Sequence, residues 1–201
     1  ATYSILKSSV DAEQLEDERE RLTLQPRASF GKPPPAFPVW SEDDTMFHVP
    51  RFYGIDRFGD AEFDDRVKGL PVEHMQFTGT LTPVQIRAMD AIQKHMGASG
   101  VKGSIVSLPC GMGKTVFAVA FAARMKRKTA IIVHKGQIGD QWVETFQRFS
   151  PGLKIGWIQG KDWQMEGMDV LVCMVMTLAK RELDPRLFDE FGVVIADEAH
   201  H

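Results

Sequence analysis

A short glycine turn at residues 109–115 constrains the fold of this chain more than any other stretch of its sequence. The turn reads Pro-Cys-Gly-Met-Gly-Lys-Thr; it follows the apolar run Ser104–Leu108 and opens the apolar stretch Gly113–Met125. Glycines allow the backbone to curl so that its N–H groups converge, and the N-terminus of a following helix adds a field that favours anions. The turn therefore predicts a strand, a phosphate-binding loop and a helix in succession.

The residues of this turn have distinct expected roles in holding a nucleotide. Lys114 would reach the β and γ phosphates, and the Thr115 hydroxyl would hold Mg²⁺. The general pattern G-x-x-x-x-G-K-[ST] is incomplete because Leu108 stands where its first glycine belongs. The alternative is a glycine-rich turn with a surface lysine. We predict nucleotide binding by five consecutive residues: Gly111, Met112, Gly113, Lys114 and Thr115.

A carboxylate pair, Asp197 and Glu198, follows the apolar strand-like run Val193–Ala196. Parallel strands place ligands at their carboxyl ends, so this pair would face the phosphate loop if the two preceding strands are neighbours. Asp197 is then suited to hold Mg²⁺ through water, and Glu198 to accept a proton from an attacking water as general base. The alternative is an ordinary acidic loop after a strand.

Strand-like and helix-like segments alternate from Phe77 onward. The expected strands cover 104–108, 129–133, 154–158, 170–175 and 193–196, and the expected helices begin near Pro83 and cover 113–125, 137–149 and 185–190. Alternation at this spacing implies right-handed crossovers and a parallel sheet. The predicted fold class is α/β, with a central parallel sheet.

The first 76 residues differ from the rest of the chain in texture. Residues 9–25 predict one charged helix with few apolar anchors, which must dock on a partner surface or fray. Prolines in residues 26–45 favour an extended linker. Residues 46–76 are rich in aromatic side chains and predict a compact accessory segment of short strands or loop that packs against the following domain. The expected divisions are therefore 1–45, 46–76 and 77–201.

Composition and charge place few limits on the class of protein. The chain is 43% hydrophobic and 25% charged, without an apolar run near the roughly 18 residues of a membrane span and without a secretory signal at its start. Its two cysteines lack metal-ligand spacing, so a soluble, intracellular protein is expected. The net charge is −3, yet residues 101–150 hold eight basic and two acidic side chains, which suits phosphate partners or a solvated helix end.

The phosphate loop and the Asp-Glu-Ala-His box at residues 197–200 resemble motifs of superfamily 2 helicases, in particular the XPB-like branch with its relatives from large DNA viruses. The resemblance covers about residues 77–201. It implies a RecA-like P-loop NTPase lobe that uses ATP and Mg²⁺ to move along or remodel nucleic acid, with DNA favoured and RNA possible. It also implies that residue 201 precedes a second lobe carrying an arginine finger. The 201 residues alone would then bind nucleotide but hydrolyse it poorly.

Further positions resemble binding positions of that family. Gln85, in the segment 80–85, matches a glutamine that reads the adenine edge, although Thr82 as N-cap with Gln85 also forms a capping-box pattern; the two roles are compatible. His134 and Lys135 at one strand end, and Thr177 at another, match positions that contact the nucleic-acid backbone.

Two expectations depend on the residues alone. Trp142 shares a predicted helix face with Ile138, Phe146 and Phe149, which favours a place in the core. His200 and His201 lack a second ligand pair, so a metal site there is not expected.

Two other functions fit the motifs. An ATP-switched nucleic-acid-binding module could regulate transcription without unwinding a duplex. A P-loop kinase would need a lid and a phosphoacceptor site, and the sequence indicates neither.

Overall fold

The chain forms two compact units, Ala1–Arg66 and Val67–His201, in a computed structural model that describes residues 2–26, 31, 33–64, 67–96, 103–181 and 183–199. The boundary falls after Arg66 and differs from the divisions expected at 45 and 76. Residues 67–76 belong to the second unit because Val72 and Met75 are buried in its core and Leu70 exchanges backbone hydrogen bonds with Glu190 and Lys128. No helix of the described residues is long and apolar enough to cross a membrane.

The first unit is built on a small antiparallel sheet. Its strands β1 (Thr2–Leu6), β5 (Met46–Pro50) and β4 (Ser41–Glu42) pair in the order β1-β5-β4. A separate short pair joins β2 (Thr23–Leu24) to β3 (Phe37–Pro38). The core of this unit consists of five buried apolar side chains: Ile5, Leu15, Leu22, Phe47 and Val49.

Two helices complete the first unit, α1 (Ala12–Arg21) and α2 (Arg51–Phe58), with a 3-10 turn at Lys7–Ser9. The Asp11 side chain caps α1 by accepting a hydrogen bond from the backbone N–H of Gln14. The helix was expected to dock on a partner or fray; instead it docks within its own unit. The sequence interpretation overlooked that Leu15 and Leu22 share a face and that a charged side chain can be buried when it is paired.

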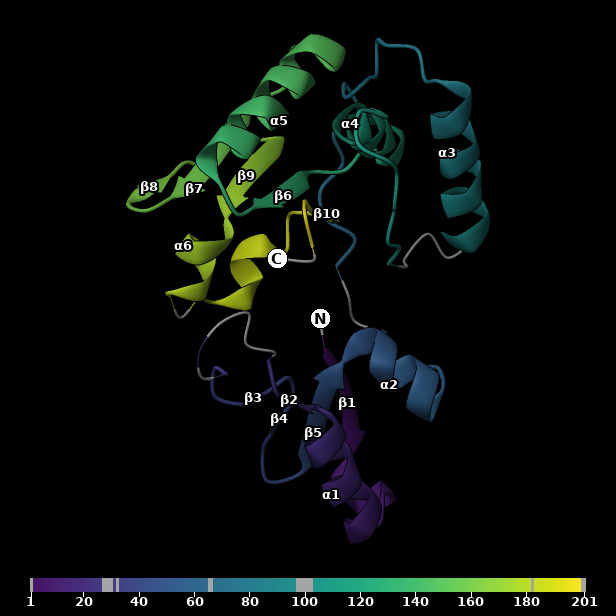
Figure 1. The fold of residues 1–201 in the computed structure, drawn as a ribbon, viewed down its shortest axis with the longest axis vertical. Coiled ribbons are helices and arrows are strands. Elements are labelled where there is room, and N and C mark those ends of the chain that lie inside the picture. The colour runs from purple at the N-terminus through teal and green to yellow at the C-terminus, as the bar shows by residue number, and fades with distance from the viewer. Residues whose placement is uncertain are drawn as a thin grey trace. The chain divides into compact units, whose positions relative to one another are not determined.

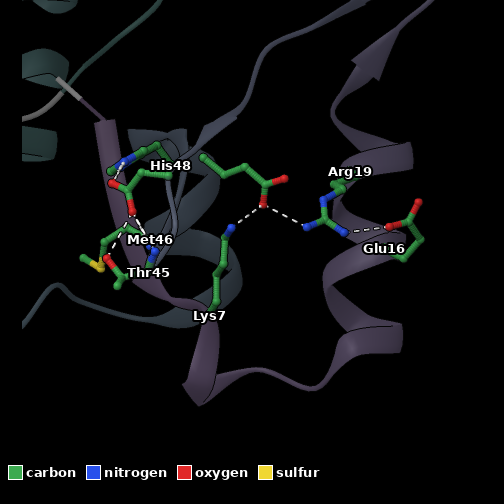
Figure 2. Close-up of polar contacts among 8 residues, drawn as sticks. Lys7, Glu16, Arg19, Thr45, Met46 and His48 are labelled. Carbon is green, nitrogen blue, oxygen red and sulfur yellow. Dashed lines mark hydrogen bonds and ion pairs between the residues drawn. The ribbon is translucent and has the colours of Figure 1, made fainter.

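Polar contacts tie α1 to the strands of the first unit. The carboxylate of Glu42 accepts from both Arg19 (2.8 Å) and Lys7 (3.1 Å), and Arg19 also contacts Glu16 (2.7 Å), as Figure 2 shows. Val39, in the segment expected to be an extended linker, donates its backbone N–H to Leu22 (2.8 Å). The described part of that segment is therefore folded against α1; residues 27–30 and 32 of the predicted linker lie outside the described residues.

The second unit contains a five-stranded sheet in the order β10-β6-β9-β7-β8. The first four of these strands pair in parallel, and β8 pairs antiparallel with β7 at the edge. This confirms the predicted α/β fold with a parallel sheet. The strand bounds are β6 (Thr129–Val133), β7 (Ile155–Gln159), β8 (Asp162–Trp163), β9 (Val170–Met174) and β10 (Val193–Ala196).

Helices α4 (Lys114–Met125), α5 (Gly136–Phe149) and α6 (Val175–Ala179) lie against this sheet, and a 3-10 turn follows at Pro185–Phe188. Helix α3 (Pro83–Met96) packs on α4 instead (Figure 1). Side chains of α4 and α5 pack with Ile131, Val133 and Val172 in one core cluster. Leu178 and Phe188 pack in a second cluster with Leu171 and with other strand residues whose side chains point to the opposite face of the sheet. The inner strands β6 and β9 are thus buried on both faces, as is usual in parallel sheets, whereas Val194 of the edge strand β10 is 66% exposed.

One predicted strand, 104–108, does not form. Residues 103–109 have no regular secondary structure and no ladder partner, and Ile105 is 97% exposed. A strand needs a hydrogen-bonded neighbour as well as β-branched residues, and the sheet ends instead at β10. The apolar run therefore leads into the glycine turn as an unpaired segment.

Candidate nucleotide site

The phosphate loop adopts a conformation that requires its glycines. Gly111 and Gly113 have φ angles of 78° and 69°, in the left-handed region that side-chain-bearing residues rarely enter. A Cβ added to Gly113 would lie 2.7 Å from Gln85 Nε2, whereas one added to Gly111 would meet nothing within 4 Å. Gly113 is also the N-cap of α4. The loop thus curls directly into a helix N-terminus, as the sequence predicted.

Lys114 and Thr115 are the first two residues of α4 and are half-buried. The Lys114 ammonium donates to the backbone oxygen of Leu108 at 3.4 Å, which folds the side chain back over the loop. The first N–H groups of a helix lack intrahelical acceptors. With the ammonium beside them, they form an arrangement that can hold a phosphate chain.

Gln85 is 3% exposed and uses both ends of its carboxamide. Its oxygen accepts from the Thr82 N–H (2.8 Å), while the Thr82 hydroxyl accepts from the Gln85 N–H (3.4 Å), so the capping box is present. Its Nε2 donates to the backbone oxygens of Met112 and Gly113, both at 3.0 Å. Gln85 therefore braces the phosphate loop from the start of α3, and its adenine contact stays a prediction.

Asp197 follows β10 directly and is held at two points. Its backbone N–H donates to Ile132 of β6 (3.0 Å), and its Oδ2 accepts from the indole N–H of Trp142 in α5 (2.8 Å). Glu198 has a φ of 53°, a left-handed conformation that is uncommon for a residue with a side chain and recurs at functional sites. His200, the last residue of the predicted box, lies outside the described residues.

Helix packing connects the two elements that carry the halves of the candidate site. The sequence predicted that they would meet if the strands before them were neighbours, but no strand leads directly into the phosphate loop in the described residues. Instead, α4 packs on β10, so the helix that begins with Lys114 and Thr115 contacts the strand that ends before Asp197. Mg²⁺ prefers oxygen ligands. The Thr115 hydroxyl and the Asp197 carboxylate, of which only Oδ2 accepts from Trp142, are therefore suited to that ion.

The candidate nucleic-acid contacts lie at the carboxyl ends of β6 and β9. His134 is half-buried and Lys135 exposed. The Thr177 hydroxyl accepts from the Gly160 N–H at 3.0 Å, closing the loop after β7. Sequence reasoning missed Arg181, which donates to the Gly160 oxygen (2.8 Å) and lies 4.9 Å over the Trp163 ring. Arg181 and Trp163 are 18 positions apart in the sequence, so no local pattern indicated this contact.

The two cysteines differ in accessibility. Cys110, in the phosphate loop, is exposed, and Cys173, in β9, is buried. Burial raises the pKa of the Cys173 thiol to about 12. Because the thiolate is the reactive form, Cys173 is inert at neutral pH and Cys110 is a specific chemical handle in the loop.

Comparison with known proteins gives a family match over most of the second unit and relatives whose similarity extends into the first unit. The family described as "Type III restriction enzyme, res subunit" matches residues 78–201. The L396 protein of Acanthamoeba polyphaga mimivirus, named as an ATP-dependent RNA helicase, is 32% identical over 206 residues, which cover 99% of this chain and 39% of that protein. The 109L protein of Invertebrate iridescent virus 3, named as a helicase, is 28% identical over 76% of this chain and 49% of its own length.

A yeast protein and one solved structure extend the comparison. IRC3 of Saccharomyces cerevisiae, named as an ATP-dependent helicase, is 33% identical over 60% of this chain and 19% of its own length. This chain thus spans less than half the length of each named relative. The Sulfolobus solfataricus SWI2/SNF2 ATPase core in complex with dsDNA is similar over 61% of this chain and 32% of that chain, with 16% identity and a TM-score of 0.46.

Proposed function

This chain belongs to the family of the Type III restriction enzyme res subunit, and we propose that its second unit is the ATP-binding lobe of a nucleic-acid helicase or translocase. The observation that carries the proposal is the phosphate loop: two left-handed glycines lead into the N-terminus of α4, where Lys114 stands. The names of the viral and yeast relatives support the use of ATP. The activity and substrates of the whole protein belong to this proposal, because this chain covers less than half the length of its named relatives.

The lobe's residues have separate roles in this proposal. The N–H groups of residues 111–115 and the Lys114 ammonium bind the phosphate chain and orient it. Thr115 and Asp197 would hold Mg²⁺, which would supply positive charge to the phosphate chain when bound. Glu198 accepts a proton from the attacking water. Gln85 keeps the loop carbonyls in place, and its adenine contact would require Nε2 to exchange partners.

We propose that nucleic acid lies across the carboxyl ends of β6 and β9, at His134, Lys135 and Thr177. These positions follow adjacent parallel strands and therefore open on one edge of the sheet. DNA is the expected substrate, from the resemblance to the XPB-like branch. RNA is the alternative, which the name of the mimivirus relative favours.

Cys110 provides a direct test of nucleotide binding. We expect ATP with Mg²⁺ to slow the reaction of Cys110 with a thiol reagent about 10-fold at neutral pH, because bound phosphate covers the loop. Cys110→Ser should abolish the fast-reacting thiol, since Cys173 is buried. Lys114→Ala should leave the thiol reactive and remove the protection. Equal labelling rates with and without nucleotide in the wild type would sink the proposal.

The proposed catalytic role needs a second measurement. In a form of the protein that carries a second lobe, ATP hydrolysis should rise when DNA or RNA is added. Glu198→Gln should lower the stimulated rate at least about 100-fold while nucleotide protects Cys110 as in the wild type. A mutant as fast as the wild type would remove Glu198 from the mechanism. Stimulation by one nucleic acid and not the other identifies the substrate. Stimulated hydrolysis without strand separation would favour translocation or an ATP-switched binding module.

A further inference from the structure

A hydrogen bond joins the core of the second unit to the candidate metal ligand. Trp142 in α5 donates its indole N–H to Asp197 Oδ2 at 2.8 Å, although the two residues are far apart in the sequence. Trp142 is 2% exposed and belongs to the core cluster under the sheet. Its ring lies 6.1 Å from that of Phe146, one turn further along the same helix. The donor is therefore fixed in position by packing.

The acceptor distinguishes Trp142 from the other tryptophans that the structure describes. Trp40 donates to the Arg19 backbone oxygen and the Thr23 hydroxyl, and Trp163 to the Gly160 backbone oxygen. Only the Trp142 indole, among the described tryptophans, bonds a carboxylate. A buried indole N–H needs an acceptor, but a neutral carbonyl would satisfy it. A bond to an ionised acceptor is shorter and stronger, so it also restricts the rotation of the Asp197 side chain.

We propose that Trp142 is a positioning residue that orients the Asp197 carboxylate for Mg²⁺. The indole occupies Oδ2, the β6 backbone at Ile132 holds the Asp197 N–H, and Oδ1 is left for the ion or its bound water. This inference rests on the proposed function, since it assigns Asp197 to the metal. Groups that orient a metal ligand from behind in this way commonly alter metal affinity about 10-fold or more when removed.

The test measures the Mg²⁺ dependence of nucleotide binding in Trp142→Phe. Phenylalanine keeps an apolar ring in the core and removes the N–H donor. We expect the Mg²⁺ concentration at half-maximal protection of Cys110 by ATP to rise about 10-fold, while affinity for ATP without Mg²⁺ stays within about twofold. The matched control is Trp157→Phe, because the Trp157 ring also packs against α5, at Gly139. It should shift neither quantity.

A spectroscopic readout is independent of activity and of the mutant's folding. The chain has four tryptophans, so ¹⁵N-labelled protein gives few indole signals, and the Trp142 signal is the one lost in Trp142→Phe. If that variant does not fold, single substitutions of the other three tryptophans assign it by elimination. We expect the Trp142 signal to move in Asp197→Asn and on addition of Mg²⁺ with ATP.

The outcomes separate this inference from the proposed function. A wild type without Mg²⁺-dependent nucleotide binding would overturn the proposed function. A wild type that binds, with an unchanged Mg²⁺ midpoint in Trp142→Phe, would overturn the positioning role alone. The positioning role would also be overturned if the Trp142 indole signal stayed unchanged both in Asp197→Asn and on addition of Mg²⁺ with ATP. This outcome does not depend on the folding of Trp142→Phe.

Discussion

At the scale of single residues, Gly113 is the position where the phosphate loop tolerates least change. Gly113→Ala combines a left-handed φ, costing about 1–2 kcal/mol for a residue with a Cβ, with a contact of 2.7 Å to Gln85 Nε2. We expect it to weaken ATP binding more than about 10-fold. Gly111→Ala is the matched variant, since it has the same strain in open space and should weaken binding less. Equal losses would show that the Gln85 contact is irrelevant.

Gln85 has two candidate roles that one substitution separates. Gln85→Glu keeps the shape and the oxygen that accepts from Thr82, but it places a second oxygen against the carbonyls of Met112 and Gly113. Because that contact is repulsive, a bracing role predicts an equal loss of ATP and GTP binding, of about 10-fold or more. A role in reading adenine predicts a loss for ATP alone. Competition binding with the two nucleotides decides between them.

The residue scale also shows what sequence can and cannot predict. Glycine positions in the phosphate loop follow from local backbone sterics, so the pattern alone indicated them correctly. The core position of Trp142 was predicted from helical spacing, but its bond to Asp197 joins α5 to the end of β10. Periodicity within one helix carries no information about a partner on another element, so that contact could not be predicted.

At the scale of elements, short apolar runs are the least certain predictions. β6, α5 and β10 form within a residue or two of their expected bounds, because each combines a matching period with turn residues at its ends. The run 104–108 has the same composition but lacks a hydrogen-bonded neighbour. β8 and α6 were not expected, since two and five residues are too short for a periodic signal. For short strands such as β8, a pairing partner decides whether the strand forms, and the local sequence does not specify that partner.

The contact between α1 and α2 gives a prediction at this scale. Glu18 of α1 is fully buried and accepts from the Tyr53 hydroxyl and from Arg57 at 2.7 Å. Burial alone would raise the pKa of Glu18, but hydrogen bonds from Tyr53 and Arg57 and the charges of Arg57 and Arg21 outweigh it and lower the pKa below 4.5. A carboxyl with a lowered folded pKa stabilises the fold above its unfolded pKa, and this contribution is lost as pH falls through the folded pKa.

We therefore expect the first unit to lose stability progressively below about pH 4.5. Glu18→Gln should flatten that acid limb and cost about 2 kcal/mol at neutral pH, since a charge-assisted bond is replaced. Tyr53→Phe is the milder control, because it retains the pair with Arg57. Urea unfolding followed at the indole signal of Trp40, the one tryptophan of residues 1–66, gives both quantities. An acid limb that persists unchanged in Glu18→Gln would exclude Glu18 as its source.

At the scale of the whole molecule, charge is divided unequally between the two units. Residues 1–66 hold 8 basic and 14 acidic side chains, and residues 67–201 hold 16 and 13, so the units carry −6 and +3. A polyanion is attracted to the second unit and repelled by the first. Net charge alone does not locate the nucleic-acid contact within the second unit, however, because several lysines of that unit are exposed.

The salt dependence of nucleic-acid binding locates the contact within that unit. Each lysine that neutralises a phosphate adds nearly one to the slope of log K against log salt concentration. If Lys135 contacts the backbone, Lys135→Ala should lower that slope by about 1 for every sequence tested. Lys94→Ala changes the net charge equally, from the exposed C-terminal part of α3, and should leave the slope unchanged. Equal slopes for both variants would mean that binding senses only overall charge, and the edge formed by β6 and β9 would lose its assignment.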